Sequence, residues 1–94
     1  MENLVIIGKK PLEKYCFTVL DLSNKFRNVV VRARGTNMVK AINLAEIVRR
    51  KFGLEVDGIK IGTEKVERDG KEKNISFIEI NLKNKKGKEI GIIS

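Results

Sequence analysis

Two short basic motifs contain the residues of this sequence that are best suited to chemistry. Gly8-Lys9-Lys10-Pro11 places two ammonium groups side by side, and Arg32-Ala33-Arg34-Gly35-Thr36-Asn37 carries two guanidinium groups followed by polar side chains. Lysine meets a phosphate as a mobile point charge, whereas the planar arginine fork can bind two phosphate oxygens at once. The two motifs together indicate recognition of phosphate groups.

Each motif also has a plainer interpretation. Paired lysines on a protein surface are common and usually interact only with water. Arg32 and Arg34 can instead form ion pairs with acidic side chains on the same surface. Whether the motifs form one site therefore depends on whether the fold places them together.

The sequence around the motifs predicts a strand, a helix and a second strand. Leu4–Ile7 is a continuous apolar run ended by Gly8, a pattern typical of a strand buried on both faces. Apolar residues at helical spacing predict a helix over about 11–25, with Pro11 in its first turn. Val29–Arg34 predicts the next strand. A unit of this kind favours parallel strands joined by a right-handed crossover.

Parallel strands would bring both motifs to one edge of the sheet, because each motif lies at the carboxyl end of a strand. The N-terminus of the helix that follows each motif would add partial positive charge there. This edge is the candidate phosphate-binding surface, and its predicted members are Lys9, Lys10, Arg32, Arg34, Thr36, Asn37 and Lys40.

A second helix is predicted over about 36–52, with Thr36 or Asn37 as its N-cap and Gly53 as its C-cap. Its apolar residues are Met38, Ala41, Ile42, Ala45, Val48 and Phe52 on the main face, with Leu44 and Ile47 beside it. The last two widen the face beyond what a single core contact needs. A deeply packed helix would explain this width, and so would contact with a partner chain.

The last third of the sequence predicts a long β-hairpin with its turn at Asp69-Gly70. Counting back from the turn pairs Ile61 with Ile78, so that apolar side chains meet. Residues 63–76 are mostly polar and would project as an arm on the order of 20 Å long. The tail, about residues 84–94, is left open between a short edge strand and a loose end.

The composition favours a polyanionic partner. The chain has 94 residues and a net charge of +8, and residues 1–54 hold 11 basic and 4 acidic residues. A basic protein of this size, expected to form a single domain over residues 1–94, is typical of nucleic-acid binding.

Several classes of function are excluded or disfavoured. Histidine is absent, which excludes histidine-based catalysis and histidine metal sites. Cys16 is the single cysteine, so no intramolecular disulfide can form, and we expect it to be a buried apolar residue in a reducing compartment. No apolar run approaches the length of a membrane span. We therefore predict a non-enzymatic protein without a cofactor, a metal, a small-molecule substrate or a membrane partner.

The acidic residues of the arm are the main sign in favour of an enzyme, since a nuclease could use them to hold a metal. They are Glu64, Glu67, Asp69 and Glu72. Solvated surface charge is the plainer interpretation, because the arm carries as many basic as acidic residues and is net neutral.

The hairpin register sorts these charges onto two faces of the arm. One face carries Arg68, Lys71 and Lys73, and the other carries Glu67 and Glu72. A neutral arm can therefore still bind a polyanion. We predict that the three basic residues face the nucleic acid and that the two glutamates point away.

Seven short motifs, spread over about residues 3–83, follow one another in an order that is hard to match by chance. They are Gly8-Lys9-Lys10-Pro11 with Tyr15, Arg32-Ala33-Arg34-Gly35, Lys40-Ala41, Glu46-Ile47-Val48-Arg49 with Phe52, Ile61-Gly62-Thr63, Asp69-Gly70 and Ser76-Phe77-Ile78-Glu79-Ile80. Together they resemble the Alba family. The resemblance implies an α+β fold in the order strand–helix–strand–helix–strand–strand, with two helices on one face of a four-stranded mixed sheet and a long hairpin arm. This is the fold of the C-terminal domain of translation initiation factor three.

The resemblance also implies a function. Family members are small archaeal chromatin or RNA-binding proteins whose dimers contact the nucleic-acid backbone and whose arms reach toward the minor groove. The family's backbone contacts correspond to Lys9, Lys10 and Arg34, and its acetylated lysine corresponds to Lys9. Its aromatic contact between neighbouring dimers corresponds to Phe52.

We therefore predict a protein that binds double-stranded DNA, RNA or both through phosphates, with an architectural role on the chromosome in the cytoplasm. It would act as a homodimer or as a heterodimer with a paralogue. A dedicated RNA-binding protein or ribonucleoprotein subunit is the alternative. Thr36 stands where many relatives have a basic residue, and with a neutral arm this favours a weaker or more selective binder.

Overall fold

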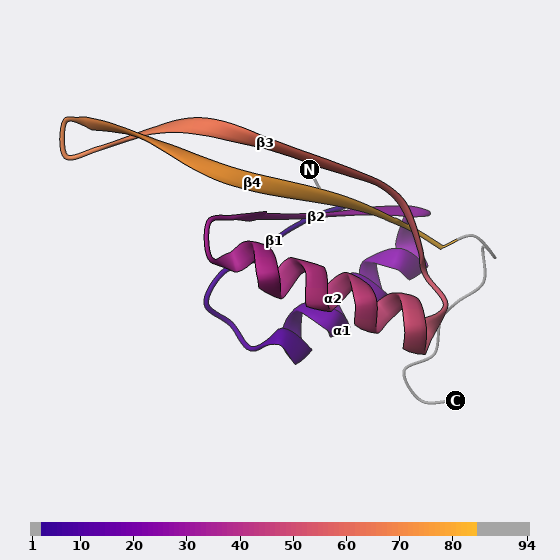
Figure 1. Ribbon diagram of the computed structural model, residues 1–94. Coiled ribbons are helices and arrows are strands. Elements are labelled where there is room, and N and C mark those ends of the chain that lie inside the picture. Colours follow the sequence, from indigo (N-terminus) through magenta and orange to yellow (C-terminus); the bar gives the residue numbers. More distant parts are fainter. Residues whose placement is uncertain (1–2, 85–94) are drawn as a thin grey trace.

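The elements of the chain follow the predicted order. A computed structural model describes residues 3–84, and the predicted alternatives for the tail therefore lie outside the described residues, apart from Asn84. The elements are β1 (Leu4–Ile6), α1 (Leu12–Lys25), β2 (Asn28–Arg34), α2 (Asn37–Phe52), β3 (Glu55–Arg68) and β4 (Lys71–Lys83). Figure 1 shows both helices on the same side of the strands. The predicted α+β fold is confirmed.

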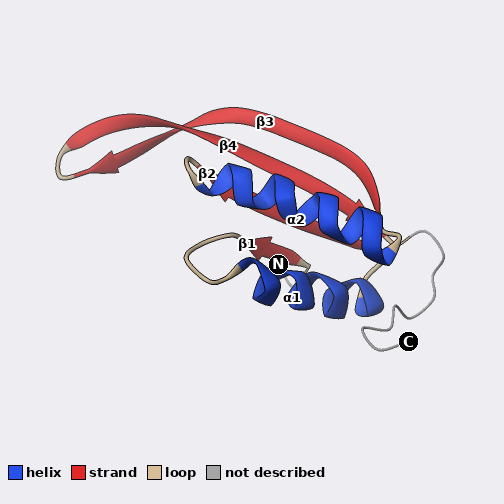
Figure 2. Ribbon diagram, turned by 60° about the horizontal axis from the view of Figure 1, so that its bottom comes forward, coloured by secondary structure: helices blue, strands red, loops and turns tan. Residues whose placement is uncertain are grey.

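The four strands form one mixed sheet in the order β1-β2-β4-β3. β1 and β2 are parallel, as predicted, with Val5 opposite Val31, and the other two pairs are antiparallel. Helices α1 and α2 cover one face of this sheet (Figure 2), and no other element within residues 3–84 covers the opposite face. We call that opposite face the open face.

The core lies between the helices and the sheet. Val29 and Val31 of β2 and Ile80 and Leu82 of β4 point into it, and each is at most 1% exposed. Strand side chains alternate between the two faces of a sheet, so the residues between these four point to the open face. Arg32 is one of them, which places the second basic motif partly on the open face.

β1 is an edge strand, and the prediction that it is buried on both faces is wrong. Val5 points into the core and is 5% exposed, whereas Ile6 lies on the open face and is 66% exposed. The helices cover only one face of the sheet, so even a continuous apolar run buries only alternate side chains.

The buried face of α2 also differs from the predicted one. Ala41, Leu44, Ala45 and Val48 are buried, and Ile42 is exposed. Leu44 follows Ala41 by three residues and precedes Val48 by four, so it completes the helical stripe that faces the sheet. Leu44 therefore belongs to the centre of the core and Ile42 to the surface.

The two ends of α2 differ in how they are capped. Gly53 ends the helix as predicted, with φ of 74° and its N–H donating to the carbonyl oxygen of Val48. This left-handed conformation favours glycine over residues with a side chain. At the other end Thr36 occupies the N-cap position, but its side chain makes no capping hydrogen bond.

The predicted hairpin register is confirmed from Ile59 opposite Ile80 to the turn. The turn residues Asp69 and Gly70 have φ of 55° and 73°, which both central positions of a tight hairpin turn require. β2 ends at Arg34, so the arm, residues 63–76, extends beyond it without a third strand beside it (Figure 1). The arm contributes to an elongated molecule of 50 × 23 × 22 Å.

Candidate nucleic-acid interface

One tyrosine holds residues 8–11 of the loop between β1 and α1, a segment that we call the lysine loop. The phenolic oxygen of Tyr15 accepts hydrogen bonds from the backbone N–H groups of Gly8 at 2.8 Å and Lys10 at 3.2 Å. A Cβ atom at Gly8 would lie 3.4 Å from that oxygen, in van der Waals contact with it, so Gly8 and the Tyr15 hydroxyl are closely packed. With its backbone fixed in this way, the lysine loop presents Lys9 and Lys10 to solvent.

Lys40 joins α2 to the same loop. Its ammonium group donates hydrogen bonds to the carbonyl oxygens of Gly8 at 2.8 Å and Lys10 at 3.1 Å, and it lies 5.9 Å from the centre of the Tyr15 ring. Two of its three N–H donors are thus used within the protein. Lys40 thus positions the lysine loop, in addition to its predicted contact with phosphate, which stays a prediction.

The two basic motifs lie at one edge of the sheet, as predicted from parallel pairing of β1 and β2. Figure 1 shows the lysine loop and the β2–α2 loop at the end from which the arm extends. Within residues 3–84, Lys9 and Lys10 have no ion-pair partner. Their charge is therefore available to a ligand at the edge that also carries the arm.

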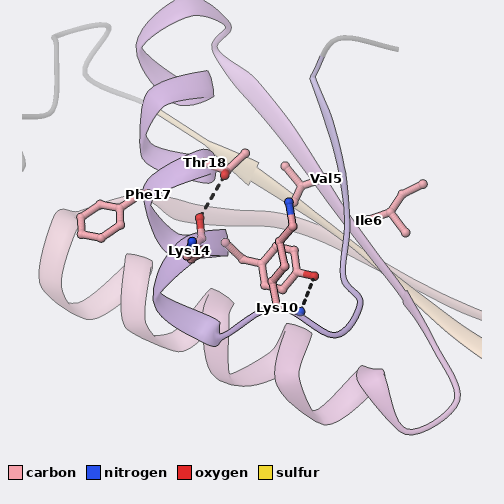
Figure 3. A pocket seen from close by; sticks show the side chains of 7 residues that line it. Val5, Ile6, Lys10, Lys14, Phe17 and Thr18 are labelled. Atoms are coloured by element: carbon pink, nitrogen blue, oxygen red, sulfur yellow. Dashed lines mark hydrogen bonds between the residues drawn. The ribbon is translucent and has the colours of Figure 1, made fainter.

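A hollow of about 490 Å³ lies beside the lysine loop, between β1 and α1 (Figure 3). It is lined by Val5, Ile6, Lys10, Lys14, Tyr15, Phe17 and Thr18. The hydroxyl of Thr18 donates to the backbone carbonyl oxygen of Lys14 at 2.9 Å. The Lys14 ammonium group forms no ion pair within residues 3–84, so its charge extends the basic surface along α1.

Arg32 lies on the open face among acidic and aromatic partners. Its guanidinium forms ion pairs with Glu64 and Glu79 and lies 4.5 Å from the centre of the Phe77 ring. The ring itself lies against Gly62, where a Cβ atom would come within 2.8 Å of it. The alternative that Arg32 pairs with surface acids is therefore what the structure shows, and a phosphate contact by Arg32 stays a prediction.

Arg34 is more accessible than Arg32. Its side chain is 54% exposed, against 22% for Arg32, and its Nη1 atom lies 3.5 Å from Oε2 of Glu64. A smaller hollow of about 210 Å³ is lined by both arginines, Glu64 and the half-buried Asn37, together with Ile6, Ile7 and Ala33. Arg34 and Asn37 are thus brought together as predicted, whereas Thr36 lies exposed beside them.

Sequence reasoning did not place Glu64, Glu79 and Phe77 at this site. The hairpin register is set by a local turn, but the pairing of β2 with β4 joins segments more than 40 residues apart. That pairing places Arg32 opposite Glu79. The complementary charges of Arg32 and Glu79 are the sequence signal for this pair, and the hairpin register then brings Glu64 to the same end of the sheet.

The arm carries its basic residues on the predicted face. In the observed register Arg68 lies opposite Lys71, and Lys73 lies one step nearer the body on the same side. All three are exposed, and by strand alternation they share the open face with Arg34. Glu67 and Glu72 lie directly opposite each other on the other face, and the contact of the arm with nucleic acid stays a prediction.

Phe52 lies half-buried at the end of α2 and packs against the core. It also lines a groove between α1 and α2 with Leu12, Phe17, Leu20 and Ile47 among others. Phe17, on α1, is 52% exposed. The groove is thus an apolar surface near Phe52, and the predicted contact between neighbouring dimers stays a prediction.

Cys16 is buried, as expected from its place on the apolar side of α1. Burial raises the pKa of its thiol, Glu13 raises it further, and Lys51 lowers it by a smaller amount. A thiol held in its protonated form is a poor nucleophile. Residues 3–84 contain no group of three or more Cys, Asp or Glu side chains placed to hold a metal ion, and no helix in that range is long and apolar enough to cross a membrane.

Sequence comparison relates the chain to one family. The family model for Alba matches residues 3–63. The DNA/RNA-binding protein Alba of Thermoplasma acidophilum is 36% identical over 84 residues, which cover 86% of this chain and 94% of the relative. The DNA/RNA-binding protein Alba of Picrophilus torridus is 38% identical over 85 residues, with the same two coverages of 86% and 94%.

Solved structures agree with this relationship. Alba from Thermoplasma volcanium superposes on this chain with a TM-score of 0.80 at 33% identity. The superposition covers 87% of this chain and 100% of the other. ALBA1 from Trypanosoma brucei superposes with a TM-score of 0.76 at 19% identity, covering 88% of this chain and 69% of that one. The second likeness concerns the fold alone.

Proposed function

This chain belongs to the Alba family, and from that membership and the charge of its sheet edge we propose that it binds nucleic acid without catalysing a reaction. The observation that carries the proposal is the lysine loop, whose backbone is fixed by Tyr15 and whose two lysines have no ion-pair partner within residues 3–84. Two relatives at 36% and 38% identity are named as DNA/RNA-binding proteins.

Binding would rest mainly on phosphate neutralisation. Lys9 and Lys10 stand just before the N-terminus of α1, where the helix dipole also favours an anion. Arg34 stands at the same sheet edge and offers a fork that can bind two phosphate oxygens. Each phosphate that these residues neutralise releases counterions, so binding would weaken steeply with salt.

The arm would add contacts in a groove of the nucleic acid. Arg68, Lys71 and Lys73 continue the basic surface beyond Arg34 along the open face. A net-neutral arm adds little long-range attraction, so its contribution would come from close contacts after the lysine loop has engaged.

An exposed apolar strip supports a dimer. The strip consists of Val39, Ile42, Ile59 and Ile61, which are 46–71% exposed. Ile59 and Ile61 lie on the helix-covered face, yet they stay uncovered because β3 lies at the sheet edge beyond α2. Large exposed apolar residues that cluster on one side of a small protein are typical of an interface. We place a second copy of this chain, or a paralogue, on the strip.

The proposed setting is the chromosome, in the cytoplasm of the cell, with DNA and RNA both as ligands. A dedicated RNA-binding role remains the alternative, because the relatives are named for both nucleic acids. Competition between a duplex DNA and a structured RNA for the labelled protein, at one fixed salt concentration, decides between them.

The test of the main proposal is a salt series. Fluorescence anisotropy with a labelled duplex should give a log K that falls linearly with log salt, by about 0.9 per neutralised phosphate and on the order of 4 to 8 in total per dimer. A slope near zero would contradict binding through phosphates. The same titration with a labelled structured RNA measures the affinity for RNA and its dependence on salt.

Single-residue variants show which residues contribute to the slope of log K against log salt. Lys9→Ala, Lys10→Ala and Arg34→Ala should each weaken binding and flatten the slope by up to about one unit per protomer. Lys25→Ala is the control, since Lys25 lies at the far end of α1 and pairs with Asp21 at 3.6 Å. Acetyl-lysine at Lys9 should act like the alanine, because it also removes the charge. Normal binding by the Lys9 and Lys10 variants would mean that the lysine loop is merely solvated.

A further inference from the structure

Four charged side chains gather where the arm leaves the body. Arg32 and Arg34 of β2 meet Glu64 of β3 and Glu79 of β4 on the open face, and we call these four residues the arginine cluster. Two positive and two negative charges make the cluster neutral. It therefore adds nothing to long-range attraction of a polyanion, in contrast to the lysine loop.

The two glutamates of the cluster differ in what they contact. Among residues 3–84, Glu79 pairs only with Arg32, whereas the Glu64 carboxylate contacts both Arg32 and Arg34, one with each of its oxygens. A carboxylate held between two guanidinium groups uses the same donors that a pair of arginines offers to a phosphate. Glu64 therefore occupies a site whose chemistry suits the ligand of the proposed function.

The two arginines also differ in how firmly they are held. Arg32 keeps Glu79 and the Phe77 ring even without Glu64, so its guanidinium stays in place when the Glu64 contact is broken. Arg34 has Glu64 as its only ion-pair partner within residues 3–84, at 3.5 Å and with 54% of its side chain exposed. Exposed ion pairs of this kind are weak and can be exchanged for a stronger anion.

We propose that the Glu64 carboxylate occupies, in the free protein, the place that a nucleic-acid phosphate takes in the complex between Arg32 and Arg34. Binding at this point is an exchange of one anion for another: the phosphate replaces Glu64 on Arg34 while Arg32 stays anchored by Glu79. This inference rests on the proposed function and adds a residue that tunes its affinity. Glu64 competes with weakly bound polyanions for the Arg34 guanidinium, and it is displaced by one that presents a phosphate at the base of the arm.

The competition has a measurable size. A ligand that must first displace an internal competitor binds more weakly by the fraction of protein in which the site is free. Glu64→Gln removes the negative charge but keeps a side chain of the same shape that can still accept hydrogen bonds from Arg32. We expect Glu64→Gln to bind a labelled duplex about fivefold more tightly, the factor that corresponds to loss of one exposed ion pair as competitor. The salt slope should change little, because the same phosphate is neutralised in both complexes and only the internal competitor has been removed.

Glu67→Gln is the matched control. Glu67 lies three residues beyond Glu64 on the same strand and carries the same charge. Its side chain is on the other face of the arm, paired with Glu72, and it contacts neither Arg32 nor Arg34. A general effect of net charge would raise affinity equally in both variants. A gain for Glu64→Gln that is no larger than the gain for Glu67→Gln would overturn the inference.

A double-mutant cycle gives the second test. In an Arg34→Ala background the gain from Glu64→Gln should fall to that of Glu67→Gln, because the arginine that Glu64 withholds is gone. Persistence of the full gain in that background would mean that Glu64 acts through charge alone. Circular-dichroism melting curves of every variant establish that each is folded at the assay temperature.

A measurement on the unaltered chain does not depend on any variant. The side-chain carboxyl carbon of Glu64 should shift in the NMR spectrum when duplex is added, whereas that of Glu79 should stay nearly constant because its contact with Arg32 persists. An unmoved Glu64 signal in a saturated complex would overturn the exchange while leaving the proposed function standing. Failure of the unaltered protein to bind duplex or RNA would instead overturn the proposed function.

Discussion

The ammonium nitrogen of Lys40 lies 2.8 Å from the carbonyl oxygen of Gly8, so the second helix is joined directly to the lysine loop. Tyr15 holds the same loop from the first helix, through hydrogen bonds to its backbone N–H groups. The loop is thus fixed from both sides, by an acceptor and by a donor. A loop whose backbone is preorganised loses less entropy when its lysines bind a ligand.

Replacing Lys40 by methionine should loosen the lysine loop without unfolding the protein. The change removes both hydrogen bonds to the loop, so the amide protons of Gly8 and Lys10 should exchange with solvent more quickly. Hydrogen-exchange NMR measures this directly, and Lys25→Met serves as the control at the far end of α1. Unchanged exchange at both amides would mean that Tyr15 alone holds the loop.

An acidic residue in the apolar strip should separate the proposed dimer into monomers. Ile61 is 71% exposed on the helix-covered face, at the sheet edge beyond α2, so Ile61→Asp leaves the core intact while placing a charge in the proposed interface. Sedimentation velocity should then show a monomer. The control is Ile6→Asp, because Ile6 is 66% exposed but lies on the open face at the other end of the strand order. A dimer that survives Ile61→Asp but not Ile6→Asp would move the interface to β1.

The hairpin shows how far local sequence signals reach. The Asp69-Gly70 turn sets the register of the two strands, and every pair from Ile59 opposite Ile80 onward follows from it. The parallel pairing of β1 and β2 was equally predictable, because a short strand–helix–strand unit permits few other arrangements. The hairpin register and the parallel pairing together place the lysine loop, Arg34 and the arm at one end of the molecule.

The parts that were not predicted depend on packing between distant segments. The burial of Leu44 in place of Ile42 depends on the rotation of α2 over the sheet, which the helical pattern alone left open. The partners of Arg32 depend on the pairing of β2 with β4, for which no turn gives a register. A basic motif read in isolation therefore overstated the free charge, since Arg32 is balanced by Glu64 and Glu79.

Variants of Phe52 and Phe17 test whether the groove between α1 and α2 mediates the proposed contact between neighbouring dimers. Both line the groove between α1 and α2, but Phe52 is half-buried against the core whereas Phe17 is 52% exposed. We expect Phe52→Ala to keep the proposed dimer but to reduce cooperative binding along a long duplex. The free energy of unfolding should fall by less than about 3–5 kcal/mol, the loss for a fully buried phenylalanine. Phe17→Ala should reduce cooperativity with little change in stability.

Binding isotherms on duplexes of increasing length measure this cooperativity. Equal cooperativity in the unaltered protein and in both variants would refute the role of the groove. Phe52 would then be a core residue only, and thermal unfolding would report its full contribution.

The thiol of Cys16 should react slowly while the protein is folded. Burial, followed by Glu13, raises its pKa in the folded state above the ordinary value of about 8.5. A raised pKa favours the fold as long as the thiol is protonated, so this contribution is complete below the unfolded pKa and is lost as pH rises through the folded value. Iodoacetamide labelling at pH 8 should therefore be slower than in denaturant, and the free energy of unfolding should fall above pH 9. Labelling at the same rate in both conditions would show that Cys16 is accessible.

Strand alternation sorts the charges of the arm onto its two faces. Arg68 and Lys71 lie opposite each other next to the turn on the open face, whereas Lys65 lies on the other face opposite Asn74. Arg68→Ala and Lys65→Ala remove the same charge from the same strand, so any difference between them reports facing and not net charge. We expect Arg68→Ala to weaken duplex binding more than Lys65→Ala, and Arg68→Ala with Lys71→Ala to weaken it well beyond either. Glu67→Gln with Glu72→Gln should strengthen binding only modestly, through long-range charge. Anisotropy titrations at one salt concentration rank these variants, and a Lys65 variant as damaging as the Arg68 and Lys71 pair would mean that the other face of the arm meets the nucleic acid.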